Sequence, residues 1–137
     1  MSTEDLKAKV RRLVEEGWNK GNMAVFDELC APNVVLHHPT YPQTSREGLK
    51  GFCSALRSMA PDLHITTDDL MAAEGDKVVI RVTERCTDTF GAPERGLAPT
   101  GKQLTITGIM IYAFAGGKVV EEWEEVDTVG MQKQQQA

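Results

Sequence analysis

The sequence lacks a basic cluster, a long apolar run and a regular cysteine pattern. The net charge is −5 at pH 7, and the absence of a basic patch argues against nucleic acid and anionic membrane surfaces as partners. No apolar stretch is long enough to cross a bilayer, and the first residues, MSTEDLKAKVRR, lack the apolar segment of a signal peptide. We therefore expect a cytoplasmic protein that binds neither nucleic acid nor membranes.

Cysteine is scarce as well. Cys30, Cys53 and Cys86 are odd in number and widely spaced, so they form neither a disulfide framework nor a zinc-binding pattern. We interpret them as small core residues. The sequence also contains no P-loop, no GxGxxG turn after a strand and no HExxH motif. We therefore predict no metal or nucleotide site.

What is present is a clear change of periodicity along the chain. With 137 residues and 41% hydrophobic composition, we expect one domain spanning 1–137. Apolar residues recur at helical spacing in the first half and alternate in the second. The predicted helices are 4–18, 23–30 and 44–62, with a short strand at 33–38. Four strands joined by turns follow, at 63–74, 77–89, 102–115 and 118–127.

Helices that precede an antiparallel meander favour an α+β fold over a parallel α/β sheet. A strongly curved, mainly antiparallel sheet around three helices would form a cone with a central cavity, the usual form of a small-molecule site. Gly108 or a bulge could supply the bend, and a bulge would break the alternation of faces in a neighbouring strand. We expect the long loop 90–101 to cover the cavity and the polar tail 131–137 to fray.

The last predicted strand, KVVEEWEEVDTVG, carries an unusual number of acids. Successive side chains of a strand point to opposite faces. One face would hold Val120, Glu122, Glu124 and Val126. The other would hold Val119, Glu121, Trp123, Glu125 and Asp127. Neither face is cleanly apolar or cleanly polar, so some acids are expected to leave water.

A carboxylate in an apolar cavity could act as a general acid/base. Burial disfavours its charged form and raises its pKa, which makes it a better base for a carbon-bound proton and then a better acid. Glu122, Glu124 and Asp127 are the candidates. The alternative is a solvated strand edge on which the acids pair with lysines or arginines.

Two pairs of polar residues could likewise lie either in the cavity or on the surface. His37 and His38 are adjacent, so their rings point to opposite faces of a strand and cannot bind one metal together. Either one ring faces the cavity as a donor or acid/base partner, or one is packed and the other is on the surface. Arg81 and Arg85 are either surface ion-pair partners or cavity residues that polarise a carbonyl.

Large apolar side chains would line any cavity that the cone encloses. Flat walls suit a flat aromatic ligand. The alternative for each of these side chains is the ordinary core. The candidates are Trp18, Phe52, Met59, Met110 and Tyr112.

Four segments together resemble the SnoaL-like polyketide cyclases, or ester cyclases, of the NTF2-like superfamily. They are GWNKGNMAVFDELCAPNVVLHHP, REGLKGFCSALRSMAPDL, PTGKQLTITGIMIYAF and GKVVEEWEEVDTVG. The likeness runs in order over nearly the whole chain. It implies the α+β cone with three N-terminal helices, and an enzyme that closes a ring by intramolecular aldol condensation without a metal or organic cofactor.

The resemblance also implies site residues. Glu124 corresponds to the family's general acid/base, which is usually Asp, and Asp127 corresponds to a second acid. His37 matches the histidine of the first strand, with His38 one residue away. Glu122 stands where the family often has His. These two departures add a methylene at one position and exchange an imidazole for an acid at the other.

Taken together, these observations predict a small enzyme whose substrate is an apolar, carbonyl-rich molecule. Glu124 would move the proton, with Asp127 as second acid, while His37 and Arg81 orient the carbonyl and His38 and Glu122 contact the substrate. The alternatives are an isomerase or hydrolase on the same cone, or a non-catalytic module that binds a small molecule or a protein. We also expect a homodimer, because an outer sheet face with Ile109, Ile111 and Trp123 would leave apolar surface uncovered.

Overall fold

The first helix begins where the sequence supplies a cap. Ser2 Oγ accepts a hydrogen bond from the Asp5 backbone N–H at 3.1 Å, and Asp5 Oδ2 accepts one from the Ser2 backbone N–H at 3.2 Å. This capping box satisfies two groups that a helix start leaves unpaired. Helix α1 spans Thr3–Arg12 and passes into a π-helical segment, η1, at Leu13–Trp18. The predicted helix at 4–18 is therefore present, but its last turns are wider than α-helical ones.

Helix α2, Met23–Leu29, lies directly against η1. Asn22 caps it by accepting a hydrogen bond from the Ala24 backbone N–H at 3.2 Å. The two segments approach so closely that a Cβ added at Gly17 would lie 3.0 Å from the Phe26 ring. A glycine at this position therefore lets η1 and α2 share one apolar interface.

Helix α3, Arg46–Met59, is capped one residue later than the sequence suggests. Thr44 and Glu47 have capping-box spacing, but the cap is Ser45, whose Oγ accepts a hydrogen bond from the Gly48 backbone N–H at 3.0 Å. Serine and threonine are both common N-caps, with serine somewhat preferred, so spacing alone does not choose between adjacent hydroxyl residues.

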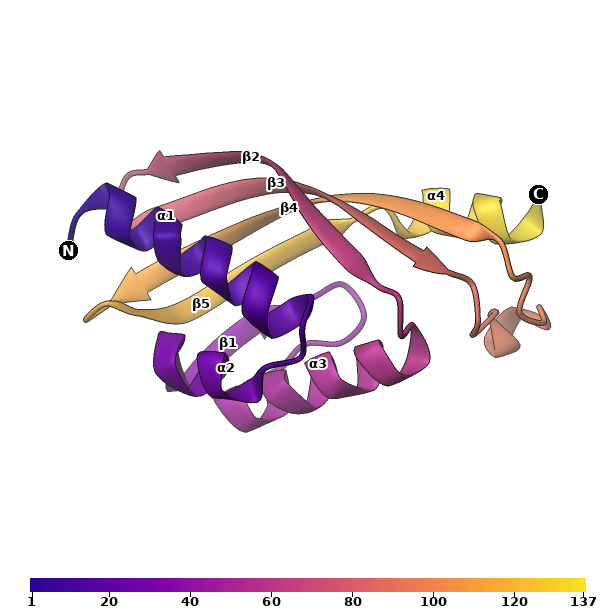
Figure 1. Ribbon diagram of the computed structural model, residues 1–137, viewed down its shortest axis with the longest axis horizontal. Coiled ribbons are helices and arrows are strands. Elements are labelled where there is room, and N and C mark those ends of the chain that lie inside the picture. The colour runs from indigo at the N-terminus through magenta and orange to yellow at the C-terminus, as the bar shows by residue number, and fades with distance from the viewer.

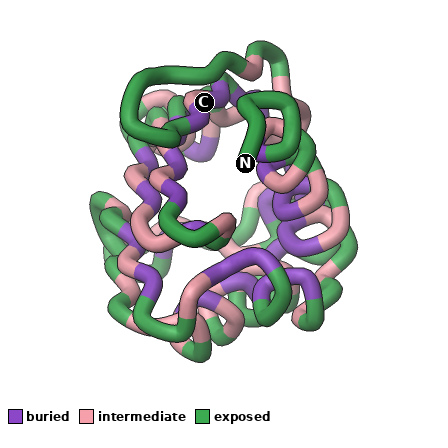
Figure 2. The backbone as a smooth tube through the Cα atoms, turned by 90° about the vertical axis from the view of Figure 1, so that its left-hand side faces the viewer, coloured by how far each residue is buried: buried purple, intermediate pink, exposed green.

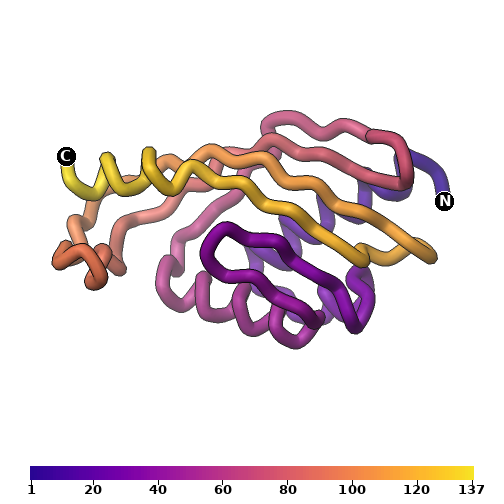
Figure 3. The backbone as a smooth tube through the Cα atoms, turned by 180° about the vertical axis from the view of Figure 1, so that it is seen from behind, coloured from indigo at the N-terminus to yellow at the C-terminus, as the bar shows by residue number.

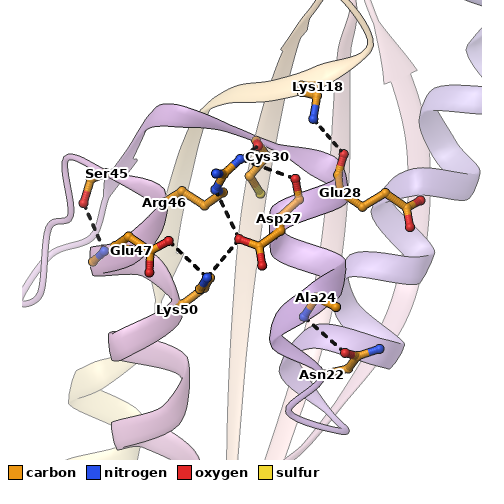
Figure 4. A network of polar contacts seen from close by, with 11 residues as sticks. Asn22, Ala24, Asp27, Glu28, Cys30, Ser45, Arg46, Glu47, Lys50 and Lys118 are labelled. Carbon is orange, nitrogen blue, oxygen red and sulfur yellow. Dashed lines mark hydrogen bonds and ion pairs between the residues drawn. The ribbon is translucent and has the colours of Figure 1, made fainter.

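Charged contacts join α2 to its neighbours (Figure 4). Asp27 Oδ1 lies 2.9 Å from Lys50 Nζ and 3.3 Å from Arg46 Nε on α3. The hydrogen bond from Lys50 lowers the pKa of Asp27. Lys118 Nζ donates to the Glu28 carbonyl oxygen at 3.2 Å. These contacts are partly exposed, so they orient α2 more than they stabilise it.

The five strands form one mixed sheet. They are β1 Cys30–His37, β2 His64–Ala73, β3 Lys77–Thr87, β4 Gln103–Ala115 and β5 Lys118–Val126. Their order is β1-β5-β4-β3-β2, with β1 parallel to β5 and the other pairs antiparallel. The Gly116–Gly117 turn joins β4 to β5 with φ of 58° and 77°, a conformation that glycine adopts readily in two-residue hairpins.

The structure describes residues 1–137 as a computed structural model, and it confirms the predicted α+β cone. Helices α1, α2 and α3 lie on the concave side of the curved sheet (Figure 1), and buried stretches of both layers face one another (Figure 2). A Cβ added to Gly108 would lie 2.9 Å from Val126 Cγ1 and 3.0 Å from the Glu125 carbonyl oxygen. The glycine therefore allows β4 to approach the end of β5 closely.

The expectation that the C-terminal tail frays is wrong. Residues Thr128–Gln136 form a helix, α4, which runs beside the loop between β3 and β4 (Figure 3). Gln134 clamps α4 to β4 because its amide both accepts from and donates to the Thr105 backbone, each at 2.8 Å. Polar composition concealed this, since the glutamine amides replace apolar contacts with backbone hydrogen bonds. None of the helices is long and apolar enough to span a membrane.

Candidate functional site

A cavity of about 680 Å³ lies between the helices and the concave sheet face. This volume is within the range of small-molecule sites, and most of the lining residues are hydrophobic. A smaller hollow of about 380 Å³ lies on the outside, between α1 and β2, and is lined almost entirely by polar residues. No group of three or more His, Cys, Asp or Glu side chains is arranged to hold a metal ion.

A β-bulge in β5 brings Val119 onto the inner face together with Glu122 and Glu124. Val119 pairs with Phe114 and Glu121 pairs with Ala113, so one residue of β5, Val120, has no partner in β4. The extra residue shifts the alternation. As a result Val119 lies on the same face as Glu122 and Glu124, and all three are buried. The two faces expected from strict alternation are therefore corrected at the start of the strand.

Glu124 lies in the cavity wall and is only 6% exposed. It is opposite Met110 of β4, which also lines the cavity. Glu124 Oε2 lies 3.6 Å from His38 Nε2. A carboxylate and an imidazole therefore face one another at the edge of an otherwise apolar space.

The hydrogen bonds of His38 fix which ring nitrogen carries the proton. Its Nδ1 accepts from the backbone N–H groups of Thr40 and Tyr41, at 3.1 and 3.0 Å. A nitrogen that accepts cannot also donate, so the proton of the neutral ring is on Nε2, toward Glu124. Burial lowers the pKa of His38, although the charge of Glu124 opposes this shift. His38 is therefore neutral at pH 7 and presents an Nε2–H donor.

His37 does not face the cavity. Its ring stacks on Trp123 with centroids 5.3 Å apart, and its Nε2 lies 2.6 Å from Glu121 Oε2. Both partners of this contact are more than one-third exposed. The expectation that His37 is the inward histidine is corrected to His38. His37 is the last residue of β1 and points outward, and His38, the residue after the strand, lines the cavity.

Glu122 and Tyr112 lie behind the cavity rather than in its wall. They are directly opposite one another in β5 and β4, and both are completely buried. Neither carboxyl oxygen of Glu122 has a hydrogen-bond partner. Burial, followed by the charge of Glu124, raises the pKa of Glu122 well above its usual range. Glu122 is therefore a neutral acid in the core. The expectation that Glu122 and Tyr112 contact the substrate is corrected, because neither residue lines the cavity.

Asp127 and Arg81 also lie away from the cavity. Asp127 follows the end of β5 and caps α4, because its Oδ1 accepts a hydrogen bond from the Gly130 backbone N–H at 2.8 Å. Arg81 is half exposed on the outer sheet face, where its Nε donates to Asp69 Oδ2 at 2.7 Å. The structure thus brings Glu124 into the cavity without the second acid or the arginine that the sequence suggested.

The apolar candidates other than Tyr112 do line the cavity: Trp18, Phe52, Met59 and Met110. Trp18 meets Phe52 edge-to-face with centroids 5.8 Å apart. His38 lies 5.3 Å from the Phe52 ring, also edge-to-face. Aromatic edges and faces thus surround the histidine, which suits a flat apolar ligand.

The sequence interpretation missed a second acid in the cavity wall, Glu84 of β3. The signal was available. Val78, Ile80 and Val82 alternate on the inner face and are completely buried, and Glu84 is the next residue in that series. An acid that continues an apolar strand face is an indication of a site.

The loop after β3 and helix α4 close one end of the cavity, and neither was predicted in detail. Arg95 Nη2 donates to Gln135 Oε1 at 2.7 Å, and Gln135 Nε2 donates to the Gly91 carbonyl oxygen at 3.0 Å. All three residues line the cavity. No pattern in the sequence pairs these positions, because the contact depends on a helix that its polar composition concealed.

Solved structures of similar fold support this architecture. A candidate polyketide cyclase from Acidithiobacillus ferrooxidans is 30% identical, with a TM-score of 0.84 over 99% of this chain and 98% of that one. IdmH, a candidate polyketide cyclase from Streptomyces antibioticus, is 27% identical, with a TM-score of 0.82 over 96% of this chain and 99% of that one. Comparison with proteins of curated function gives no match.

The family comparison covers almost the entire chain. The model of the SnoaL-like polyketide cyclases matches residues 8–135. This range includes the second half of α1, all of α2 and α3, the sheet and nearly all of α4. The chain therefore belongs to the SnoaL-like polyketide cyclase family.

Proposed function

We propose that this protein is a cofactor-independent cyclase that closes a ring in an apolar, carbonyl-rich molecule by intramolecular aldol chemistry. The main support is the placement of Glu124. It is a nearly buried carboxylate beside a neutral histidine, in an apolar cavity of about 680 Å³. Membership of the polyketide cyclase family points to the same substrate class.

The reaction needs one base and one donor. Glu124 removes a proton from the carbon next to a carbonyl, and His38 Nε2–H donates a hydrogen bond to the oxygen of the resulting enolate. The enolate carbon attacks a second carbonyl carbon of the same molecule, which forms one carbon–carbon bond. Glu124 then returns its proton to the new alkoxide. Substrate and product are isomers, so no redox partner is required.

The cavity favours this chemistry in two ways. An apolar environment strengthens the hydrogen bond to a developing oxyanion. The aromatic walls formed by Trp18 and Phe52 hold a flat chain folded, with its carbonyl groups close together. Several carbonyl groups in the substrate also delocalise the enolate charge, so the enolate needs less stabilisation from hydrogen bonds of the protein.

The test is product identity after incubation with aromatic polyketones of graded length. We expect a product of unchanged mass whose NMR spectrum shows a new quaternary or carbinol carbon. A gain of one water would instead indicate a hydrolase, and a moved double bond without a new carbon–carbon bond would indicate an isomerase. Binding without any conversion across the series would favour a non-catalytic module.

A further inference from the structure

Glu84 is a partly buried acid of the cavity wall that the reaction above leaves unused. It lies on the inner face of β3, between Val82 and Cys86 in the alternating series, both of which are buried. It shares the cavity wall with Glu124 of β5. Two carboxyl groups from different strands thus face the same apolar space.

No cation compensates Glu84. Arg81 and Arg85 lie on the opposite, solvent-facing side of β3, where both are exposed, and Arg81 is paired with Asp69. Burial raises the pKa of Glu84 to about 7, and the charge of Glu124 acts in the same direction. A substantial fraction of Glu84 is therefore protonated at neutral pH.

The other titratable groups of the cavity do not change this balance. His38 is neutral for the reasons given above, and burial raises the pKa of the Cys86 thiol to about 11. Arg95 is the cation of the lining. Its Nη2 donates to Gln135 Oε1 and its Nε lies 3.8 Å from Glu94 Oε1. The charge of Arg95 is not among the causes of the Glu84 pKa shift. The remaining titratable residues of the lining, Tyr41 and Glu94, are largely exposed.

We infer that Glu84 is a second catalytic residue, a neutral carboxylic acid that donates a hydrogen bond to the carbonyl oxygen of an enolisable ketone while Glu124 takes the α-proton. The inference rests on the proposed function. When two acids share one apolar cavity, their environments separate them into a proton donor and a base. Glu84 keeps its proton throughout, so the proton balance of the reaction is unchanged.

This role also narrows the substrate class. A neutral carboxylic acid is a donor for a ketone or phenolic oxygen but offers no charge to a carboxylate or phosphate. With His38 Nε2–H as another donor, the catalytic part of the cavity suits a polarised carbonyl oxygen. The ligand group that reacts there is therefore a ketone, and a phenol such as 2-naphthol presents the oxygen of its enol form in a stable molecule.

The inference can be tested without turnover, by NMR titration of the protein labelled with ¹³C at glutamate carboxyl groups. The Glu84 signal is assigned by its absence in Glu84→Gln. We expect the Glu84 signal to titrate with a midpoint of about 7. The midpoint should be lower in Glu124→Gln, which lacks the neighbouring charge. It should be higher when 2-naphthol is bound, because the phenol oxygen accepts a hydrogen bond from the protonated acid. A midpoint near 4.5, or one that 2-naphthol leaves unmoved, would overturn the inference.

A rate measurement separates this inference from the proposed function. Proton exchange at the α-carbon of 2-tetralone should fall by about 10²-fold in Glu84→Leu, the usual effect of losing one donor to an oxyanion. Glu84→Gln retains an N–H donor, so it should recover part of the exchange rate. Its exchange rate should not show the decrease above pH 7 that ionisation of Glu84 causes in the wild type. Equal rates in wild type and Glu84→Leu would reject Glu84 and leave Glu124 untouched.

Discussion

Glu122 and Glu124 lie two residues apart on the inner face of β5, and their surroundings differ. Glu124 borders the cavity and faces His38. Glu122 is sealed in the core opposite Tyr112, with no hydrogen-bond partner for either carboxyl oxygen. Because Glu122 is neutral, the interior does not hold two negative charges side by side. A charged Glu122 would repel the charge of Glu124.

The pKa of Glu122 gives the free energy of unfolding a definite pH dependence. Because the pKa is raised in the folded state, the unfolded chain loses this proton first as pH rises. Stability from this group is complete below about pH 4.5 and falls as pH rises toward the folded pKa. Glu122→Gln cannot ionise in either state, so its stability relative to wild type should increase with pH.

Urea unfolding of both proteins at pH 5 and pH 7 measures this effect. The difference in unfolding free energy should change by up to about 1.4 kcal/mol per pH unit in favour of the variant. Any constant cost of burying an amide is the same at both pH values and drops out. A difference that does not change with pH would mean that Glu122 is ionised in the folded protein.

At the scale of elements, the site depends on the bulge in β5 and on the closing of one end by α4 and the loop after β3. Asp88 holds this loop from within. It is completely buried and accepts from the Gly91 and Thr100 backbone N–H groups at 2.8 and 3.2 Å. The loop segment 92–98 lies outside that anchor and supplies part of the cavity wall.

Shortening residues 92–98 to a glycine-rich link should therefore weaken binding more than folding. The Asp88 anchor remains, so the melting temperature should change by only a few degrees, while the affinity for 2-naphthol should fall because Arg95 and its neighbours no longer cover the cavity. Glycine substitution of Asp76 in the turn between β2 and β3, far from the lining, is the control. Unchanged affinity in the folded deletion variant would show that the loop is only a connection.

The elements show how far sequence reasoning reaches. The apolar spacing predicted three helices, the strands and the α+β cone, because burial imposes those periods directly. It failed where one residue changes a face: the bulge at Val120, and the choice of His38 over His37. Glu84 was visible in the alternation of β3 but was passed over because no motif marks it. Helix α4 was missed because glutamine–backbone hydrogen bonds have no apolar signature.

At the scale of the whole molecule, the outer sheet face has no covering layer. Helices α1, α2 and α3 occupy the concave side only (Figure 1). Ile109 is 52% exposed there, and Ile111 lies opposite both Val79 and Trp123 in the neighbouring strands. Contiguous apolar surface of this kind is typical of an interface. We propose that two copies of the chain pair through this face.

Light scattering tests the dimer. The wild-type protein should have twice the chain mass of 15.1 kDa. Ile109→Glu should be monomeric, because it places a charge next to the apolar row of Val79, Ile111 and Trp123. Val129→Glu, at an equally exposed position on α4, should remain dimeric. A monomeric wild-type protein at high concentration would reject the proposal.

The central claim is that Glu124 removes a carbon-bound proton inside the cavity, and deuterium exchange tests it most directly. Exchange of the α-protons of 2-tetralone in D₂O is followed by NMR with wild type, Glu124→Gln and Glu125→Gln; Glu125 is the next residue of β5 and is exposed on the outer face. Loss of a general base costs about 10²–10⁴-fold in rate. We predict that loss for Glu124→Gln and the wild-type rate for Glu125→Gln. Wild-type exchange by Glu124→Gln, or a wild-type rate no higher than that of buffer, would contradict the account.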